Sequence, residues 1–158
     1  MRAFDAIIVR THRSKFTQFL IYFACKLEAS FAHQFLNYLC HKLCYDNGPT
    51  YIRQTCAAYV GSFIGRAAFL SIVTVKEIIT LLVTWGNKYL DLYGSDMPDA
   101  EKHALFYSVC QSLFYLFCFK GRLLLEAGAK SFLKQLSIHR IIHSNLNPLK
   151  VNIEYSNR

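Results

Sequence analysis

The sequence predicts an all-α protein of antiparallel helix pairs stacked side by side, as in an α-solenoid. Apolar residues recur at helical spacing along most of the chain, and the breaks between these stretches are short and rich in turn-forming residues. Residues 103–119 hold six aromatic rings and no formal charge after the first residue. Because no repeat of fixed period is present, these patterns alone leave a compact helical bundle as the alternative.

The predicted helices follow one another at short intervals. We expect them near residues 14–27, 30–45, 50–65, 74–92, 102–120 and 127–143. The only stretch with possible strand character is residues 6–9. Helices of this length, each with a broad apolar face, favour antiparallel pairing of neighbours.

The connections carry start and stop signals. Residues 46–49, Asp-Asn-Gly-Pro, combine turn formers with a proline suited to the first turn of the next helix, which Thr50 could also cap. Thr74 and Glu77 have the capping-box spacing, which predicts a helix start at Val75. Residues 94–101 form the longest connection, divide the chain into two helical groups, and carry acids that favour the start of the next helix.

The helix expected after this loop should be covered by other parts of the protein. One face is apolar, and polar or tyrosine residues interrupt the others. The predicted buried face consists of Phe106, Val109, Cys110, Leu113, Phe114, Phe117 and Cys118; the interrupting residues are Tyr107, Ser108, Gln111, Ser112 and Tyr115.

The rival interpretation is a membrane-associated helical protein in which residues 104–119 contact lipid. The charge-free run is 16 residues long and is closed by Lys120 and Arg122. A helix needs about 20 predominantly apolar residues to cross a bilayer. We therefore favour a central helix of a helical array without a membrane.

The composition indicates one globular domain. The chain has 158 residues, 53% of them hydrophobic and 18% charged, which argues against disorder. Its six cysteines lie inside apolar helical patterns and no signal peptide is evident, so we expect reduced core thiols in a cytosolic or nuclear protein. The net charge of +8 permits an acidic partner. The basic residues are scattered and match no nucleic-acid-binding motif, so solvated helix faces are favoured over direct nucleic-acid binding, which stays an alternative.

We predict no metal site and no catalytic residues. Cys40, His41 and Cys44, with His33 nearby, could be assembled into a zinc site, but both cysteines continue an apolar stripe and a fourth ligand is missing. His139 and His143 are four residues apart without an accompanying carboxylate motif, which favours surface or helix C-terminal imidazoles. The sequence holds no nucleophile elbow, phosphate-binding glycine loop or pair of acids in apolar surroundings. The remaining expectation is a surface that binds other macromolecules, with no cofactor and no small-molecule substrate.

Four blocks of sequence, in order, resemble the RNA polymerase I-specific transcription initiation factor family, the growth-regulated TIF-IA type. The first is NGPTYIRQ at residues 47–54, continued by YVGSFIGRAAFL at residues 59–70. The second is TVK at residues 74–76 with Leu82 and Trp85, and the third is HxxFYSxCQSxFYxF at residues 103–117. NPLK at residues 147–150 is the fourth.

The resemblance implies a HEAT-repeat solenoid without catalytic activity. Such a factor would bind RNA polymerase I and bridge it to promoter-bound selectivity factor for ribosomal RNA gene transcription, in the nucleus and its nucleolus. Family members are several times longer, so the resemblance makes residues 1–158 a single helical-repeat segment, a central slice of a longer fold. An uncapped slice would expose apolar faces and favour self-association.

The same resemblance points to one candidate partner-binding segment. A short Leu-Ala-Arg-Ala-Lys type segment of the family is linked to the selectivity factor, and here it corresponds to Ile64, Gly65, Arg66, Ala67 and Ala68. Only the arginine and the alanine after it are unchanged. Arg66 has a second interpretation, in which it caps the C-terminal carbonyls of its own helix.

Overall fold

The computed structural model describes residues 17–150, and every regular element in this range is an α-helix. The candidate strand at residues 6–9 lies outside the described residues. The helices are α1 (Thr17–Leu27), α2 (Ala29–Tyr45), α3 (Thr50–Arg66), α4 (Ile72–Tyr93), α5 (Ala104–Glu126), α6 (Lys130–Gln135) and α7 (Ile138–Ile142).

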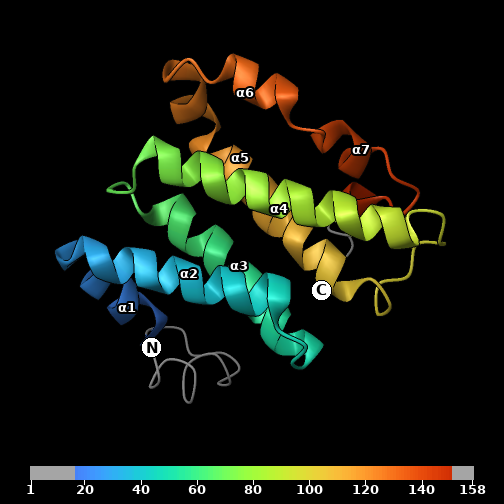
Figure 1. Ribbon diagram of the computed structural model, residues 1–158, viewed down its shortest axis with the longest axis horizontal. Helices are drawn as coiled ribbons and strands as arrows, with labels where there is room; N and C mark the ends of the chain where they lie inside the picture. Colours follow the sequence, from blue (N-terminus) through green and yellow to red (C-terminus); the bar gives the residue numbers. More distant parts are fainter. Residues whose placement is uncertain (1–16, 151–158) are drawn as a thin grey trace.

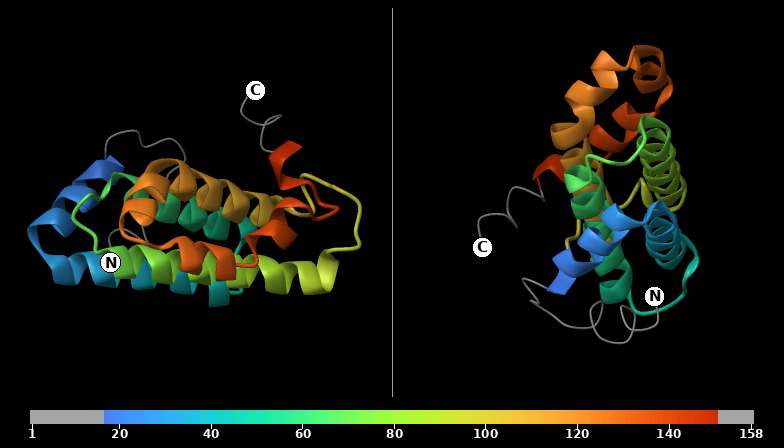
Figure 2. Two further views of the ribbon diagram at one scale, coloured as in Figure 1. Left: turned by 90° about the horizontal axis from the view of Figure 1, so that it is seen from above. Right: turned by 90° about the vertical axis from the view of Figure 1, so that its left-hand side faces the viewer.

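The helices are stacked as antiparallel pairs in two layers (Figures 1 and 2). α2 and α3 form one pair and α4 and α5 the next, and the most extensive contact joins α3 to α5. In the left view of Figure 2, α3 and α5 share one layer while α2 and α4 lie in the other. This arrangement is the predicted HEAT-like solenoid, and the compact bundle is wrong.

The core is centred on large side chains of α2, α3 and α5. Phe35 and Phe63 pack edge to face with ring centroids 5.2 Å apart, and the ring of Tyr22 from α1 lies 4.9 Å from Phe63. Phe106 and Leu113 of α5 complete the buried interior. Burial of this apolar surface is the dominant favourable term in folding.

The first four helices agree with the predicted ranges to within about three residues over the described part of the chain, whereas α5 continues to Glu126, six residues beyond its predicted end. Two start signals also differ. Ser71, and not Thr74, is the N-cap of α4: its hydroxyl accepts a hydrogen bond from the Thr74 N–H at 3.1 Å. The predicted capping box at Thr74 is therefore wrong. Pro49 occupies the N-cap of α3, where no side chain makes a capping hydrogen bond, so Thr50 begins the helix without capping it.

The acidic residues of the 94–101 loop were expected to stabilise the first turn of α5. Instead, one of them, Asp99, stabilises the turn that precedes this helix. The Asp99 carboxylate accepts hydrogen bonds from the N–H groups of Glu101 and Lys102, both at 2.9 Å. α5 begins only after His103, so the acids precede the helix instead of starting it.

The single helix expected at residues 127–143 is wrong, because the chain forms α6 and α7 with a break between them. Gly128 has a φ of +69°, a conformation that favours glycine and separates α5 from α6. Leu136 is extended and ends α6. The change of direction at Leu136 allows Ile141 of α7 to be buried against α4, where Gly86 leaves room for the Ile141 side chain.

α5 is buried over a wider surface than the sequence suggested. Phe106, Val109, Cys110 and Leu113 are buried as predicted, whereas Cys118 is exposed. Tyr107 and Ser112, expected to interrupt the outer faces, are also buried. The Tyr107 hydroxyl donates to the Leu146 carbonyl at 2.9 Å and the Ser112 hydroxyl to the Ala57 carbonyl at 2.6 Å.

The sequence argued against a membrane span because the charge-free run has only 16 residues. The helix itself is longer, so this argument from length does not hold. The helix continues to Glu126 and, at 23 residues, is long and apolar enough by length and composition to cross a bilayer. Its packing argues otherwise, since α5 contacts both α3 and α4 and buries ten of its residues. The core helix of a soluble array therefore remains the favoured interpretation.

Candidate protein-binding surface

The sequence blocks that carry the family resemblance meet where α3 packs on α5. Arg53 donates two hydrogen bonds to the Leu43 carbonyl, at 3.0 and 2.8 Å, and so ties the start of α3 to the end of α2. The Gln54 amide contacts the Ser108 hydroxyl at 3.3 Å. At Gly61, a Cβ would lie 3.1 Å from the backbone of Ser112, so the two helices approach closely there. These motifs mainly build the helix interface.

The third block begins with a buried histidine, and its Tyr107 reaches the residue before the fourth block. His103 is fully buried, and its Nδ1 lies 2.9 Å from the Tyr89 hydroxyl. The Tyr89 ring stacks on Phe106 at 5.2 Å, and burial raises the pKa of Tyr89 to about 12, so its hydroxyl stays neutral at physiological pH. The hydrogen bond from Tyr107 to the Leu146 carbonyl fixes the chain just before NPLK.

The predicted partner-binding segment, residues 64–68, covers the last turn of α3 and the two residues beyond it. The five residues of this segment differ in how far they are exposed to solvent. Ile64 and Ala67 are buried, Gly65 is half-buried, and Arg66 and Ala68 are exposed. Only Arg66 therefore offers a partner a charged side chain from this segment.

Lys120 is a structural residue that the sequence analysis missed. It is 7% exposed, and its Nζ donates to the Ala67 carbonyl at 3.2 Å, just after the end of α3. Burial lowers the pKa of its ammonium group. The sequence did contain a sign of this burial. Lys120 is four residues from both Leu116 and Leu124, which places it in the apolar stripe of α5.

Arg66 makes intramolecular contacts while its side chain stays exposed. One guanidinium nitrogen donates to the Ser62 carbonyl at 3.3 Å and to the Ser62 hydroxyl at 2.6 Å. The guanidinium carbon also lies 5.9 Å from the centre of the Tyr115 ring. The carbonyl that Arg66 contacts belongs to Ser62, just before the last four residues of α3, so both the capping role and the contact with a partner stay predictions.

Two hollows flank Arg66 along the edge of the α3–α5 layer. One, of about 580 Å³, lies between α1 and the end of α3 and is lined by Tyr22, Phe23, Phe63 and Phe69 among others. The other, of about 280 Å³, lies between α3 and α5 and includes Gln111 and Tyr115. Arg66 borders both. The hollow toward α1 is mostly apolar, whereas the one toward α5 is lined largely by polar residues such as Ser62 and Gln111. A guanidinium beside an apolar hollow suits a protein partner that offers a carboxylate next to an apolar side chain.

Gly65 is explained by its neighbour on α5. A Cβ at this position would lie 2.5 Å from Cε1 of Tyr115, so the ring packs directly on the glycine. We expect Gly65→Ala to displace the ring and to destabilise the protein by about 1 kcal/mol, because overpacking costs about 1–3 kcal/mol and alanine returns about 0.5–1 kcal/mol in the helix. Urea unfolding followed by circular dichroism measures this change.

The matched control is Gly121→Ala on α5, where a Cβ would meet nothing within 4 Å. This variant should be more stable than the parent by about 0.5–1 kcal/mol. Equal effects at the two glycines would contradict the role of the Tyr115 ring.

The histidine and cysteine pairs considered from the sequence do not assemble a metal site in the described part of the chain. No group of three or more His, Cys, Asp or Glu side chains in residues 17–150 is placed to hold an ion. Cys40 is buried and Cys44 half-buried in the predicted apolar stripe. His139 and His143 are exposed and border a shallow hollow beside α4.

Comparison with known proteins gives matches over nearly the whole chain. The family model described as RNA polymerase I specific transcription initiation factor RRN3 matches residues 1–154. The mouse RNA polymerase I-specific transcription initiation factor RRN3 is 40% identical over 154 residues, which cover 94% of this chain and 24% of that protein. The Schizosaccharomyces pombe factor rrn3 is 34% identical over 162 residues, covering 95% of this chain and 27% of that protein. The chain thus spans about a quarter of the length of these relatives.

A solved structure supports the fold. The crystal structure of RNA polymerase I transcription initiation factor Rrn3 matches with a TM-score of 0.84, covering 99% of this chain and 34% of that one. The sequence identity is 21%, so this match bears on the arrangement of the helices alone.

Proposed function

The chain belongs to the RNA polymerase I-specific transcription initiation factor RRN3 family, and we propose that it acts without catalysis as a protein-binding segment in RNA polymerase I initiation. The names of its relatives support the process. A HEAT-like solenoid supports the mode of action, because stacked helix pairs present extended surfaces to partners. By the same reasoning the protein works in the nucleus, within the nucleolus.

We further propose that the chain binds RNA polymerase I and bridges it to promoter-bound selectivity factor, and that residues 64–68 take part. The observation that carries this proposal is the exposed Arg66 guanidinium between two hollows on one edge of the α3–α5 layer. The other members of the segment act indirectly: Ile64 anchors the turn in the core, and Gly65 lets Tyr115 approach the guanidinium.

An affinity pull-down from nuclear extract tests the proposal, with the chain as bait. RNA polymerase I and the selectivity factor are probed, and RNA polymerase II serves as the negative control. We expect Arg66→Ala to reduce recovery of at least one of the first two about ten-fold, as for an arginine hot spot worth about 1.4 kcal/mol. Circular dichroism confirms that the variant bait is folded.

The matched control is Arg122→Ala, which also removes an exposed arginine near a helix end, here one paired with Glu126 at 2.7 Å. Its recovery should equal that of the parent. If folded parent bait recovers neither polymerase I nor the selectivity factor, the binding function proposed for this chain is wrong. If Arg66→Ala and Arg122→Ala behave alike, the assignment of residues 64–68 is wrong.

A further inference from the structure

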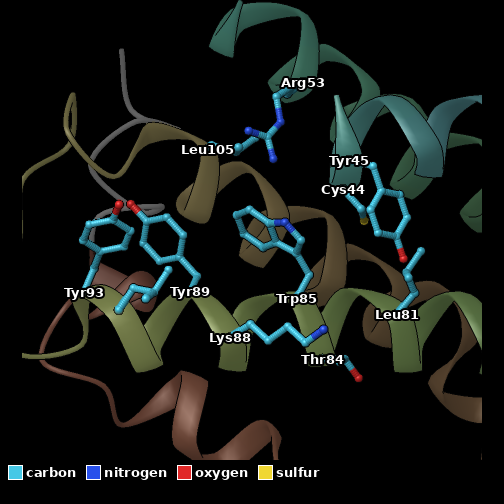
Figure 3. A pocket seen from close by; sticks show the side chains of 11 residues that line it. Cys44, Tyr45, Arg53, Leu81, Thr84, Trp85, Lys88, Tyr89, Tyr93 and Leu105 are labelled. Carbon is cyan, nitrogen blue, oxygen red and sulfur yellow. The ribbon is translucent and has the colours of Figure 1, made fainter. Parts of the chain in front are cut away.

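A second surface lies at the other end of α3, in a groove of about 390 Å³ between α2 and α4 (Figure 3). Tyr45 from the end of α2 faces Leu81 and Trp85 of α4, while Tyr93 closes the groove farther along α4. Leu105 of α5 contributes from behind. A groove of this size, mostly apolar with a few polar groups, is typical of recognition sites for small groups or single side chains.

The groove is positively charged. Arg53 and Lys88 line it, and none of its other lining residues is acidic. Arg53 is held in place by its two hydrogen bonds to the Leu43 carbonyl. Lys88 is exposed and makes no ion pair within residues 17–150. Burial raises the pKa of the Cys44 thiol, and Arg53 and Lys88 oppose this rise.

Large apolar side chains stand exposed at the edges of this groove. Tyr45 is 70% exposed and Leu92 is 74% exposed, and Tyr93 is exposed as well. We propose that the groove binds an acidic peptide segment of a partner protein, whose carboxylates pair with Lys88 and Arg53 and whose large apolar side chain packs on Trp85. Apolar burial supplies affinity in such a complex, and charge complementarity selects the partner and speeds its association.

The ring arrangement favours a peptide over a single-stranded nucleic acid, which would also present negative charge. Base stacking requires a free aromatic face. Tyr89 already stacks on Trp85 at 5.4 Å and on Phe106 at 5.2 Å, so the exposed rings of the groove, Tyr45 and Tyr93, lie at its edges. The aliphatic walls at Leu81 and Leu105 suit an apolar side chain better than a base.

This surface is separate from the one around Arg66. Arg53 lies near the start of α3 and Arg66 at its end, 13 positions later, which corresponds to about 20 Å along a helix. The acidic-peptide site therefore does not depend on the proposed polymerase or selectivity-factor contact of residues 64–68.

Trp85 is the only tryptophan of the chain, so its fluorescence reports directly on this groove. The probes are short synthetic peptides in which several Asp and Glu surround a Phe or Leu. Two matched panels replace the acids by Lys, or the apolar residues by Ser. We expect the acidic-apolar panel to shift the Trp85 emission saturably, and both matched panels to bind at least about ten-fold more weakly.

Two variants locate the binding. Lys88→Glu should weaken the acidic-apolar peptides about ten-fold, and Tyr45→Ser should weaken them by removing an apolar wall. Lys134→Glu, which makes the same charge change on α6, should leave binding unchanged. Circular dichroism establishes that all three variants are folded.

The proposal is overturned if no acidic-apolar peptide changes the Trp85 emission at millimolar concentration, or if Lys88→Glu and Lys134→Glu bind equally. It is also overturned if single-stranded oligonucleotides or phosphatidylserine vesicles bind at Trp85 more tightly than the peptides do. Either of those results would assign the groove to a different class of partner.

Discussion

Replacing Phe63 by alanine is expected to lower the free energy of unfolding by about 3–5 kcal/mol, the usual cost of truncating a buried phenylalanine. Phe63 is fully buried and contacts rings from three other segments, including Tyr22 and Phe35. A small domain has a total stability of about 5–15 kcal/mol. The loss would therefore be a large share of the stability and should be visible as a shift of the urea midpoint.

Phe31→Ala is the matched control, because Phe31 lies on α2 and is 51% exposed. We expect it to change the unfolding free energy by no more than about 1 kcal/mol. A similar loss in both variants would mean that the aromatic cluster around Phe63 is not the centre of the core. The slope of the denaturation curve should be unchanged in the control, since it scales with the surface exposed on unfolding.

The helices could be predicted from the sequence because their signals are local. The apolar periodicity of α2 to α5 persists through each helix, and the Asp-Asn-Gly-Pro break marks the boundary of α3 without tertiary information. The split between α6 and α7 was missed because it depends on tertiary packing: Ile141 reaches the core only if the chain turns at Leu136. The start of α4 was predicted at the wrong hydroxyl, because Thr74 with Glu77 matches the capping-box spacing while Ser71, three positions earlier, is the residue that caps the helix.

The candidate site was predictable only in part, for a physical reason. The sequence resemblance selected Arg66, whose side chain is exposed, and its role in binding stays a prediction. The hydrogen bond from Lys120 to the Ala67 carbonyl joins residues 53 positions apart, and the groove at Trp85 combines residues from four helices. Such contacts depend on how the helix pairs stack, and no local sequence pattern reports that stacking.

Alkaline pH is expected to destabilise the protein, and two buried thiols, Cys40 and Cys110, should alone contribute about 3 kcal/mol at pH 10 relative to pH 8. Burial raises the pKa of the Cys40 thiol to about 12 and raises that of Cys110 as well, whereas a thiol in the unfolded chain has an ordinary pKa of about 9.0. Above pH 9 the unfolded chain releases protons that the folded chain keeps, so the stability is complete below pH 9 and falls as pH rises toward the folded pKa. Each such thiol contributes a loss of about 1.4 kcal/mol per pH unit.

Other buried groups set the sign of the net effect. Burial raises the pKa of Tyr22 to about 12, which adds to the loss above pH 10, whereas the lowered pKa of Lys120 acts in the opposite direction. Burial also raises the pKa values of four further groups, namely Cys25, Cys44, Tyr59 and Tyr89. The thiols and tyrosines together outweigh one lysine, so urea unfolding with reductant present should show stability declining with pH. Cys110→Ala should reduce this decline by about 1 kcal/mol at pH 10, even though it weakens the core at every pH. Cys118→Ala removes an exposed thiol and should leave the slope unaltered; identical slopes in the two variants would show that buried thiols do not cause the decline.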